Sequence, residues 1–318
     1  MAGEDETGHV QVLAGREVPL GGQRALTVRR TLPHRDRSFV GAWCFVDHYG
    51  PVPVGPGERV MDVPPHPHTG LQTVSWLFEG VVQHDDSAGV SARVLPGEVN
   101  LMTAGSGIAH SEVSTDESQR LHGVQLWVAL PDADRHGGRG FEHHAPEAVP
   151  LPGGAGTALV FLGTLPGVDV SPVRTSTPLL GAQLDLAPGA ALDLAVDPAF
   201  EHGVLLDEGE VGVDGVALSP ADLACLDPGP RSVRLVAGDS GARLVLIGGT
   251  PFEEEVVMWW NFVGRTHDEV VAYREAYEAG SEQFGTVPGY DGERSRIPAP
   301  PLPPVRLRAR NRRGRLPA

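Results

Sequence analysis

The sequence predicts an all-β protein built from two small β-barrels in tandem, with one short helix near the C-terminal end. Glycine and proline, 41 and 29 of the 318 residues, are spread along the chain, as expected where turns separate many short strands. Short runs of β-branched and apolar residues lie between these turns. The outline of the first half recurs in the second half, which duplication of one barrel explains most simply.

The first predicted barrel runs from about Val18 to Val128. Its strand-forming runs are residues 74–80, 90–95, 99–103 and 121–130. Residues 85–89 and 95–98 have the composition of hairpin turns. Residues 131–156 are rich in Asp, Gly and Pro and poor in β-formers, so we expect a long loop that contains a domain boundary.

The second predicted barrel covers about Thr157 to Thr250 and repeats the first in outline. The run Leu206–Val213 resembles Leu77–Gln83, and a turn with Pro and an acidic residue introduces a strand in both halves. The chemistry is not repeated, because His202 is the only histidine between positions 187 and 249. We therefore expect the second barrel to lack a metal site.

One helix is predicted, over Thr266–Gly280. Thr266 and Glu269 have the spacing of a capping box, and Gly280 is a natural stop. Val270, Tyr273 and Tyr277 form one apolar stripe, which predicts packing against a sheet.

The expected domains are a metal-binding barrel over residues 1–150, a barrel without metal over 157–285, and a Pro/Arg-rich tail over 286–318. The tail combines a proline-rich stretch with six arginines between residues 306 and 315, a composition typical of a disordered segment.

The bulk composition limits the classes of function. A formal net charge of −16 disfavours general affinity for nucleic acid or for anionic membranes. The sequence has no apolar run of bilayer length and no signal-peptide pattern at its start, so we expect a soluble, cytoplasmic protein that acts as a monomer. Cys44 and Cys225 lie far apart, and no disulfide is predicted in a reducing compartment.

Two residue pairs carry the chemistry. His66 and His68 flank Pro67, and His110 and Glu112 flank Ser111. An i, i+2 spacing on a β-strand sends both side chains of a pair to the same face. Two such strands inside a barrel would bring three imidazoles and one carboxylate together, a ligand set suited to a divalent transition metal. The alternative is that two surface strands carry these polar residues by chance.

The motifs around these pairs resemble the pirin family, whose members are two-domain proteins of the cupin superfamily. The resemblance rests on Pro65–Gly70, on Leu95–Glu98 and above all on Met102–Glu112, with further similarity near both ends of the chain. It implies two tandem cupin barrels of the jelly-roll type and a metal held by His66, His68, His110 and Glu112.

Two positions depart from the patterns of these families. Cupins in general carry Glu where this chain has Gln72, which we expect to pack or hydrogen-bond beside the ligands. Many pirins carry a basic residue where this chain has Thr69, which affects the expected mouth of the pocket.

We expect the bound metal to be Fe(2+), with Mn, Co, Ni or Cu as alternatives. Four protein ligands leave up to two open positions on an octahedral ion, and Glu112 has a spare oxygen with which to act as a catalytic base. Other histidines give weaker signals. His84 either reaches the pocket or lies on a surface hairpin, and His122 is expected to be structural.

Two functions from different classes fit this reading. The first is a metal-dependent dioxygenase that acts with dioxygen on a small aromatic substrate, a quercetin-type flavonol or related aromatic enol, as the resemblance implies. The second is a non-enzymatic, redox-sensing regulatory protein that binds a partner protein according to its metal state. A cupin isomerase or a storage-like barrel is a lesser alternative.

Overall fold

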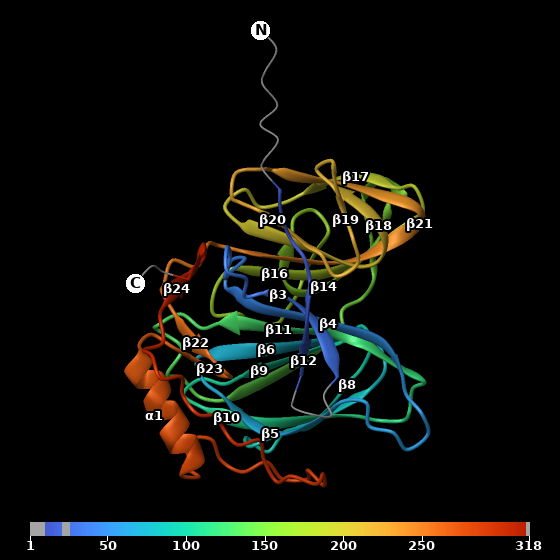
Figure 1. Ribbon diagram of the computed structural model, residues 1–318. Coiled ribbons are helices and arrows are strands. Elements are labelled where there is room, and N and C mark those ends of the chain that lie inside the picture. The colour runs from blue at the N-terminus through green and yellow to red at the C-terminus, as the bar shows by residue number, and fades with distance from the viewer. Residues whose placement is uncertain (1–9, 21–25, 316–318) are drawn as a thin grey trace. The chain divides into compact units, whose positions relative to one another are not determined.

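The computed structural model describes residues 10–20 and 26–315, and it contains mostly β-strands and one α-helix within these ranges (Figure 1). The predicted all-β class is confirmed. The chain divides into two compact units. Unit 1 consists of Met1–Gly15, Val40–Trp43 and Pro146–Phe252, and unit 2 consists of Arg16–Phe39, Cys44–Ala145 and Glu253–Ala318.

Unit 2 contains most of the elements. They are β2 (Arg16–Pro19), β3 (Thr27–Leu32), β4 (Trp43–Pro53, apart from its first residue), β5 (Asp62–His68), β6 (Leu71–Glu79), β7 (Val82–Asp86), β8 (Ser91–Val94), β9 (Val99–Thr103), β10 (Ile108–Ser114), β11 (Arg120–Ala129), β12 (Gly140–His144), β22 (Val257–Trp259), β23 (Phe262–Gly264), α1 (His267–Glu278), β24 (Arg310–Asn311) and β25 (Gly314–Arg315).

Two antiparallel sheets build the core of unit 2. One has the strand order β12-β9-β6-β11-β4-β3-β2, and the other has the order β5-β10-β7-β8. Val28, Tyr49 and Leu77 of the larger sheet share a buried cluster with Val63 and Val82 of the smaller one. The two sheets therefore pack face to face, and the strand that carries His66 and His68 pairs directly with the strand that carries His110.

Unit 1 contains β1 (Gln11–Leu13), β13 (Val149–Pro150), the 3-10 turn η1 (Pro152–Gly154), β14 (Gly156–Leu165), β15 (Asp169–Val170), β16 (Leu179–Leu186), β17 (Ala191–Ala195), β18 (Glu201–Val213), β19 (Val216–Leu218), β20 (Leu223–Leu226) and β21 (Ser232–Gly249). Its main path runs β1-β20-β18-β21-β16-β14-β13. Leucine, valine and alanine fill its core, for example Leu206 and Leu244.

The structure differs from the predicted loop over residues 131–156. Residues Gly140–His144 form β12, which pairs with β9 and places Phe141 opposite Met102. The division between the units, at Ala145 and Pro146, falls just after this strand. The weak strand propensity of this stretch is offset by the pairing that β9 offers.

The helix follows its sequence signals closely. The Thr266 hydroxyl accepts a hydrogen bond from the Glu269 amide at 3.1 Å, and Gly280 has a φ of +69° just beyond the helix end. The Glu269 carboxylate accepts from the amide of Arg265 at 2.6 Å, and a backbone hydrogen bond from Thr266 also helps to lower its pKa, in agreement with the predicted capping box. Val270 and Tyr277 are buried, and they pack in one cluster with Phe262 and Phe284.

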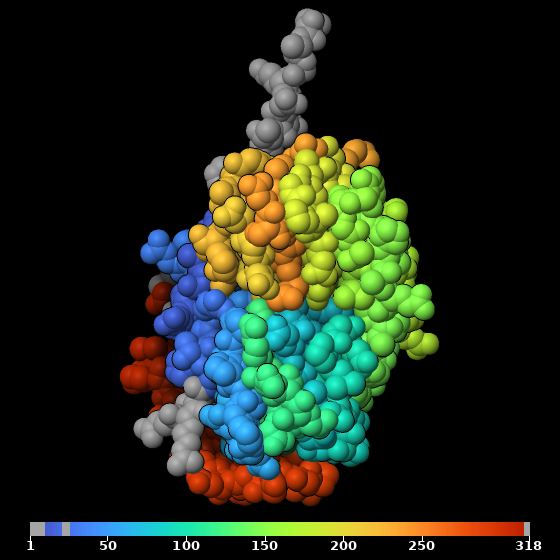
Figure 2. Space-filling view, turned by 90° about the vertical axis from the view of Figure 1, so that its right-hand side faces the viewer, coloured from blue at the N-terminus to red at the C-terminus, as the bar shows by residue number. Residues whose placement is uncertain are grey.

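The C-terminal segment differs from the expected division. The described residues from 253 to 315 are grouped with unit 2, whereas we expected 253–285 to belong with the second barrel and 286–318 to form a disordered tail. The structure describes this tail up to residue 315, and residues 316–318 lie outside the described part. Its red atoms lie against the blue and cyan atoms of earlier unit 2 segments in Figure 2. Apolar contacts of α1 and the backbone hydrogen bonds described below hold it there.

Candidate metal centre

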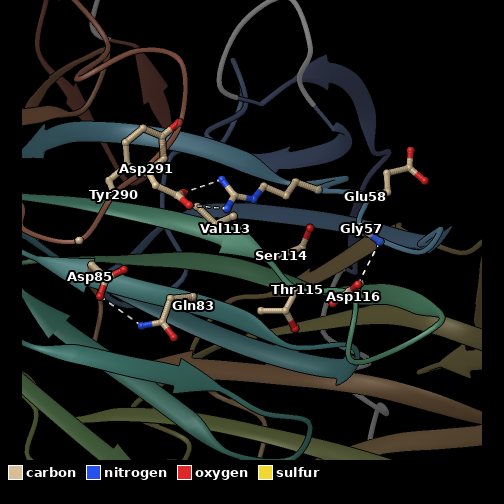
Figure 3. A pocket seen from close by; sticks show the side chains of 12 residues that line it. Gly57, Glu58, Gln83, Asp85, Val113, Ser114, Thr115, Asp116, Tyr290 and Asp291 are labelled. Carbon is tan, nitrogen blue, oxygen red and sulfur yellow. Dashed lines mark hydrogen bonds and ion pairs between the residues drawn. The ribbon is translucent and has the colours of Figure 1, made fainter.

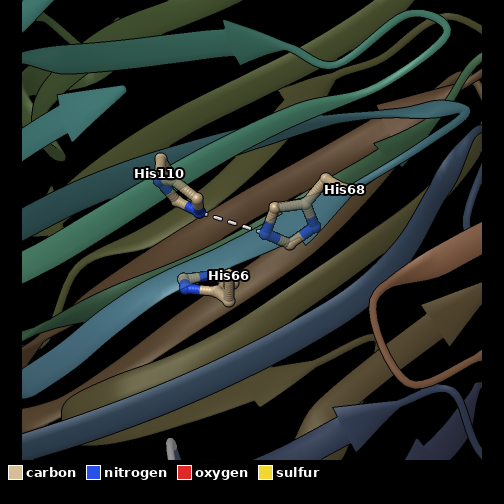
Figure 4. A group of neighbouring side chains, drawn as sticks. All are labelled: His66, His68 and His110. Atoms are coloured by element: carbon tan, nitrogen blue, oxygen red, sulfur yellow. Dashed lines mark hydrogen bonds between the residues drawn. The ribbon is translucent and has the colours of Figure 1, made fainter. Parts of the chain in front are cut away.

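Pairing of β5 with β10 brings the predicted histidines together. The antiparallel register places His110 opposite His66 and Ile108 opposite His68. The possible ligand atoms of the three histidines all lie within 4.8 Å of one another, and the Nε2 atoms of His68 and His110 are 3.0 Å apart (Figure 4). The strand arrangement predicted from the i, i+2 spacing is therefore present for these three side chains.

Burial sets the charge state of these imidazoles. His66, His68 and His110 are at most 6% exposed. Burial lowers the pKa of His66 to about 4 and the pKa values of His68 and His110 well below the usual value, and neighbouring histidines add to the effect. All three rings are consequently neutral near pH 7, the state in which an imidazole binds a metal.

The geometry of the group fits a bound transition metal. Two nitrogens bound in adjacent positions about 2.1 Å from an octahedral ion lie about 3.0 Å apart. That separation matches the distance between the His68 and His110 nitrogens. His66 fits as well, because its Nδ1 lies 2.9 Å from the Pro64 carbonyl oxygen. A proton on Nδ1 donated to this oxygen leaves the Nε2 lone pair free for an ion.

Glu112, the fourth predicted ligand, belongs to a second, adjoining group. Its ligand atom lies within 4.8 Å of those of His84 and His110, so His110 is common to both groups. The Ser75 hydroxyl hydrogen-bonds to the Glu112 carboxylate at 3.1 Å. Burial raises the pKa of Glu112, while the charge of His84 and the bond from Ser75 act in the opposite direction. The structure thus brings three of the predicted residues into one group and places the carboxylate beside it.

His84 is a residue whose role the sequence left open. It is 2% exposed, lies opposite Glu112 in the pairing of β7 with β10, and has its Nδ1 3.3 Å from Nδ1 of His110. Its Nε2 is 3.5 Å from the Asp86 carboxylate. The i, i+2 spacing of His84 and Asp86 is the same signal that marked the other pairs, and it could have identified this residue.

The remaining sequence candidates lie outside the histidine group. Gln72 is on the face of β6 opposite to Ser75, and its amide donates to the Thr103 hydroxyl at 2.9 Å. Thr69 is 1% exposed, and its backbone pairs with Phe262. His122 is buried, and its Nε2 lies 3.4 Å from Nε2 of His48.

The three histidines and Glu112 line one cavity of about 510 Å³. Aromatic rings form part of its wall: Trp127 stacks on Phe45 at 4.0 Å between ring centroids and meets the edge of His68 at 5.1 Å. Its other described lining residues are Pro19, Leu20, Arg30, Val63, Gln125, Trp260, Asn261, Arg294, Ile297, Pro298 and Pro300. A site of this size with apolar walls and a few polar groups at one place is typical of small-molecule binding.

Two glycines shape the turns next to the strands that carry the histidines. Gly70 follows β5 with a φ of +66°, and a Cβ there would lie 2.3 Å from the Val263 carbonyl oxygen. Gly105 precedes β10 with a φ of +53°, and a Cβ would lie 2.2 Å from the Gly137 carbonyl oxygen. Both positions require glycine, which explains part of the sequence motifs around the histidines.

A second cavity of unit 2, of about 460 Å³, lacks this chemistry (Figure 3). Its lining includes Glu58, Asp85, Asp116 and Asp291 but no histidine. Asp291 forms an ion pair with Arg59 at 2.7 Å, and Asp116 accepts from the amide of Gly57 at 2.9 Å. Its carboxylates therefore have partners within the chain, and the histidine-lined cavity is the stronger candidate.

Comparisons with known proteins show which family this chain resembles. The family models described as "Pirin" and "Pirin C-terminal cupin domain" match residues 25–128 and 181–285. A Pseudomonas aeruginosa protein named "Putative quercetin 2,3-dioxygenase" is 41% identical over 92% of this chain and 91% of its own length. "Pirin" of Homo sapiens is 34% identical over 67% of this chain and 75% of its own length.

A solved structure gives the same result for the fold. The crystal structure of quercetin 2,3-dioxygenase from Acinetobacter baumannii is 38% identical, with a TM-score of 0.87, and the match covers 94% of this chain and 97% of that one. The second family model covers strands of unit 1 and continues to residue 285 in unit 2, and the two models together confirm the predicted pair of tandem cupin domains. With two family models and these relatives matched along most of its length, this chain belongs to the pirin family.

Proposed function

We propose that this chain is a metal-dependent dioxygenase of quercetin-type flavonols or related aromatic enols. The observation that carries the proposal is the group of three neutral, buried histidines that lines a cavity of about 510 Å³ with aromatic walls. The names of two similar proteins, one 41% and one 38% identical, support the same reaction class.

The residues proposed to hold the metal are His66, His68, His110 and Glu112. We propose Fe(2+), with Mn, Co, Ni or Cu as alternatives, since nitrogen and carboxylate donors suit all of these ions. When bound, the metal would supply a Lewis acid and open positions for an enolate oxygen and dioxygen.

Glu112 is the proposed catalytic base. Its carboxylate has two oxygens, so one can accept a proton from a substrate hydroxyl while the other remains available to the metal. The Ser75 hydroxyl bonds to the Glu112 carboxylate and also lies 3.0 Å from the Gln125 side-chain oxygen, so Glu112 is held at the cavity wall. Phe45 and Trp127 would stack against a flat ring and keep water away from it.

The test is reconstitution with Fe(2+) followed by assay with quercetin. Oxygen uptake and loss of the flavonol absorbance should both occur, and His66→Ala and Glu112→Ala should lower kcat by about 100-fold or more. His143→Ala is a matched control, because its side chain is 45% exposed and lies outside the cavity lining. Metal content should be measured for every variant.

Tight metal binding without turnover on any aromatic enol would contradict the proposed enzyme. A metal-dependent protein partner would then support the alternative, a redox-sensing regulatory protein. Turnover that survives both site substitutions would contradict the assignment of the site.

A further inference from the structure

A segment near the C-terminal end forms one wall of the histidine-lined cavity. Arg294, Ile297, Pro298 and Pro300 all line it, and we name residues 294–300 the C-terminal wall. Sequence composition marked this segment as part of a disordered tail, and no motif connects it with the metal ligands. Its place in the cavity follows from the fold of unit 2 alone.

Hydrogen bonds attach the C-terminal wall to the metal-site strand. The Ile297 amide donates to the Pro65 carbonyl at 2.8 Å, directly before His66 in β5. The Tyr277 hydroxyl lies 2.9 Å from the Ile297 carbonyl oxygen and 3.3 Å from the Pro65 carbonyl oxygen. One tyrosine hydroxyl of α1 thus contacts both the wall and the ligand strand.

Helix α1 holds the far end of the same wall. The Ala299 amide donates to the Glu278 carboxylate at 2.8 Å, and Arg274 donates to the Pro300 carbonyl at 2.7 Å. These contacts give a proline-rich segment a defined position, although it forms no helix or strand of its own.

The charged side chains that line the cavity differ in whether they have a partner of opposite charge. Among the described lining residues, the charged side chains are Arg30, Glu112 and Arg294. Arg30 forms two hydrogen bonds of 2.7 Å with the buried Asp47 carboxylate, so its charge is balanced. Glu112 lies beside the histidines. Arg294 is exposed and has no hydrogen bond or ion pair with another described residue.

We propose that the C-terminal wall sets substrate specificity and that Arg294 binds an oxyanion, a carboxylate or sulfonate, on the aromatic enol. The inference rests on the proposed function, because the enol end of the substrate is taken to face the histidines. An arginine recognises planar or tetrahedral oxyanions through paired N–H donors. In a chain with net charge −16, an uncompensated cation at the cavity is also a local point of attraction for an anionic substrate.

The experiment compares quercetin with quercetin-5′-sulfonate on the Fe(2+)-loaded full chain. The native protein should have a higher kcat/KM for the sulfonate. Arg294→Gln should reduce the ratio of the two kcat/KM values by about tenfold, the scale of one charged hydrogen bond. Arg308→Gln removes the same charge from an exposed position outside the cavity and should leave the ratio unchanged. Raising the salt concentration should shrink the native preference.

A second variant tests the wall itself. Tyr277→Phe removes the hydroxyl that contacts Ile297 and Pro65 but retains the ring, and it should also reduce the preference for the sulfonate. Metal content, measured in parallel, separates displacement of the wall from loss of the metal site.

Measurement of flavonol binding tests the inference independently of catalysis. If the loaded protein turns over neither flavonol, quenching of tryptophan fluorescence gives the two dissociation constants. A preference for the sulfonate that Arg294→Gln removes supports the inference even when the proposed reaction fails. An unchanged ratio in Arg294→Gln, or an equal change in Arg308→Gln, overturns it.

Discussion

At the scale of single residues, burial sets the charge state of the histidines that are proposed to bind a metal. Burial lowers the pKa values of His66, His68 and His110, and this keeps the three rings uncharged near pH 7. Clustering three such groups inside a barrel is costly unless something binds them, because a buried polar group loses its water. The group therefore favours a bound cation over a purely structural role.

His202 of unit 1 provides a test of burial away from the metal site. It is 1% exposed, and burial lowers its pKa to about 4, against an unfolded value near 6.5. Between these values the unfolded chain binds more protons, so the stability of the native state falls as the pH falls from 7 toward 4. The expected contribution is about 3 kcal/mol. Urea denaturation at several pH values should show it.

His202→Gln removes this titrating group and should flatten the pH dependence of the free energy of unfolding between pH 7 and 4. His143→Gln makes the same substitution at an exposed position and serves as the control for the exchange itself. An identical slope for the native protein and His202→Gln would contradict the assignment.

At the scale of elements, pairs of strands and one helix position the site. The register of β5 with β10 brings His66 and His110 together, and β7 adds His84 on the other side of β10. The helix α1 acts through Tyr277, Arg274 and Glu278, whose hydrogen bonds hold the C-terminal wall. Loss of order in this helix would therefore affect the cavity without changing any metal ligand.

The N-terminal cap of α1 contributes to the stability of the fold separately from the metal site. Thr266→Ala removes the acceptor of the Glu269 amide and should reduce the free energy of unfolding by about 1 kcal/mol. Thr266→Ser retains the hydroxyl and should stay close to the native value. Chemical denaturation followed by circular dichroism measures both variants, and equal losses in the two would show that the hydroxyl does not act as a cap.

At the scale of the whole molecule, the four residues proposed to hold a metal belong to one unit. His66, His68, His110 and Glu112 are all in unit 2, whereas the core of unit 1 consists of aliphatic side chains. The described residues contain no helix long and apolar enough to cross a membrane. The formal net charge of −16 describes the entire chain, whereas the Arg294 side chain places a positive charge at the cavity.

Metal should therefore stabilise the two units unequally. Addition of Fe(2+) to protein freed of metal should raise the unfolding temperature of unit 2, with a gain of about 3 kcal/mol when free metal is about 100 times Kd. Anaerobic differential scanning calorimetry should show one transition that moves and one that stays, and His66→Ala should abolish the movement. A single transition that moves as a whole would contradict this expectation.

The sequence alone was sufficient for the all-β class, for the helix over 267–278 and for three histidines that share a site. These features depend on local patterns: alternation along a strand, a threonine cap, and i, i+2 spacing. Only the tertiary structure decided that Glu112 lies in an adjoining group and that residues 294–300 form a wall of the cavity. These placements depend on partners far along the chain, such as Pro65 for Ile297, and no local pattern specifies such partners.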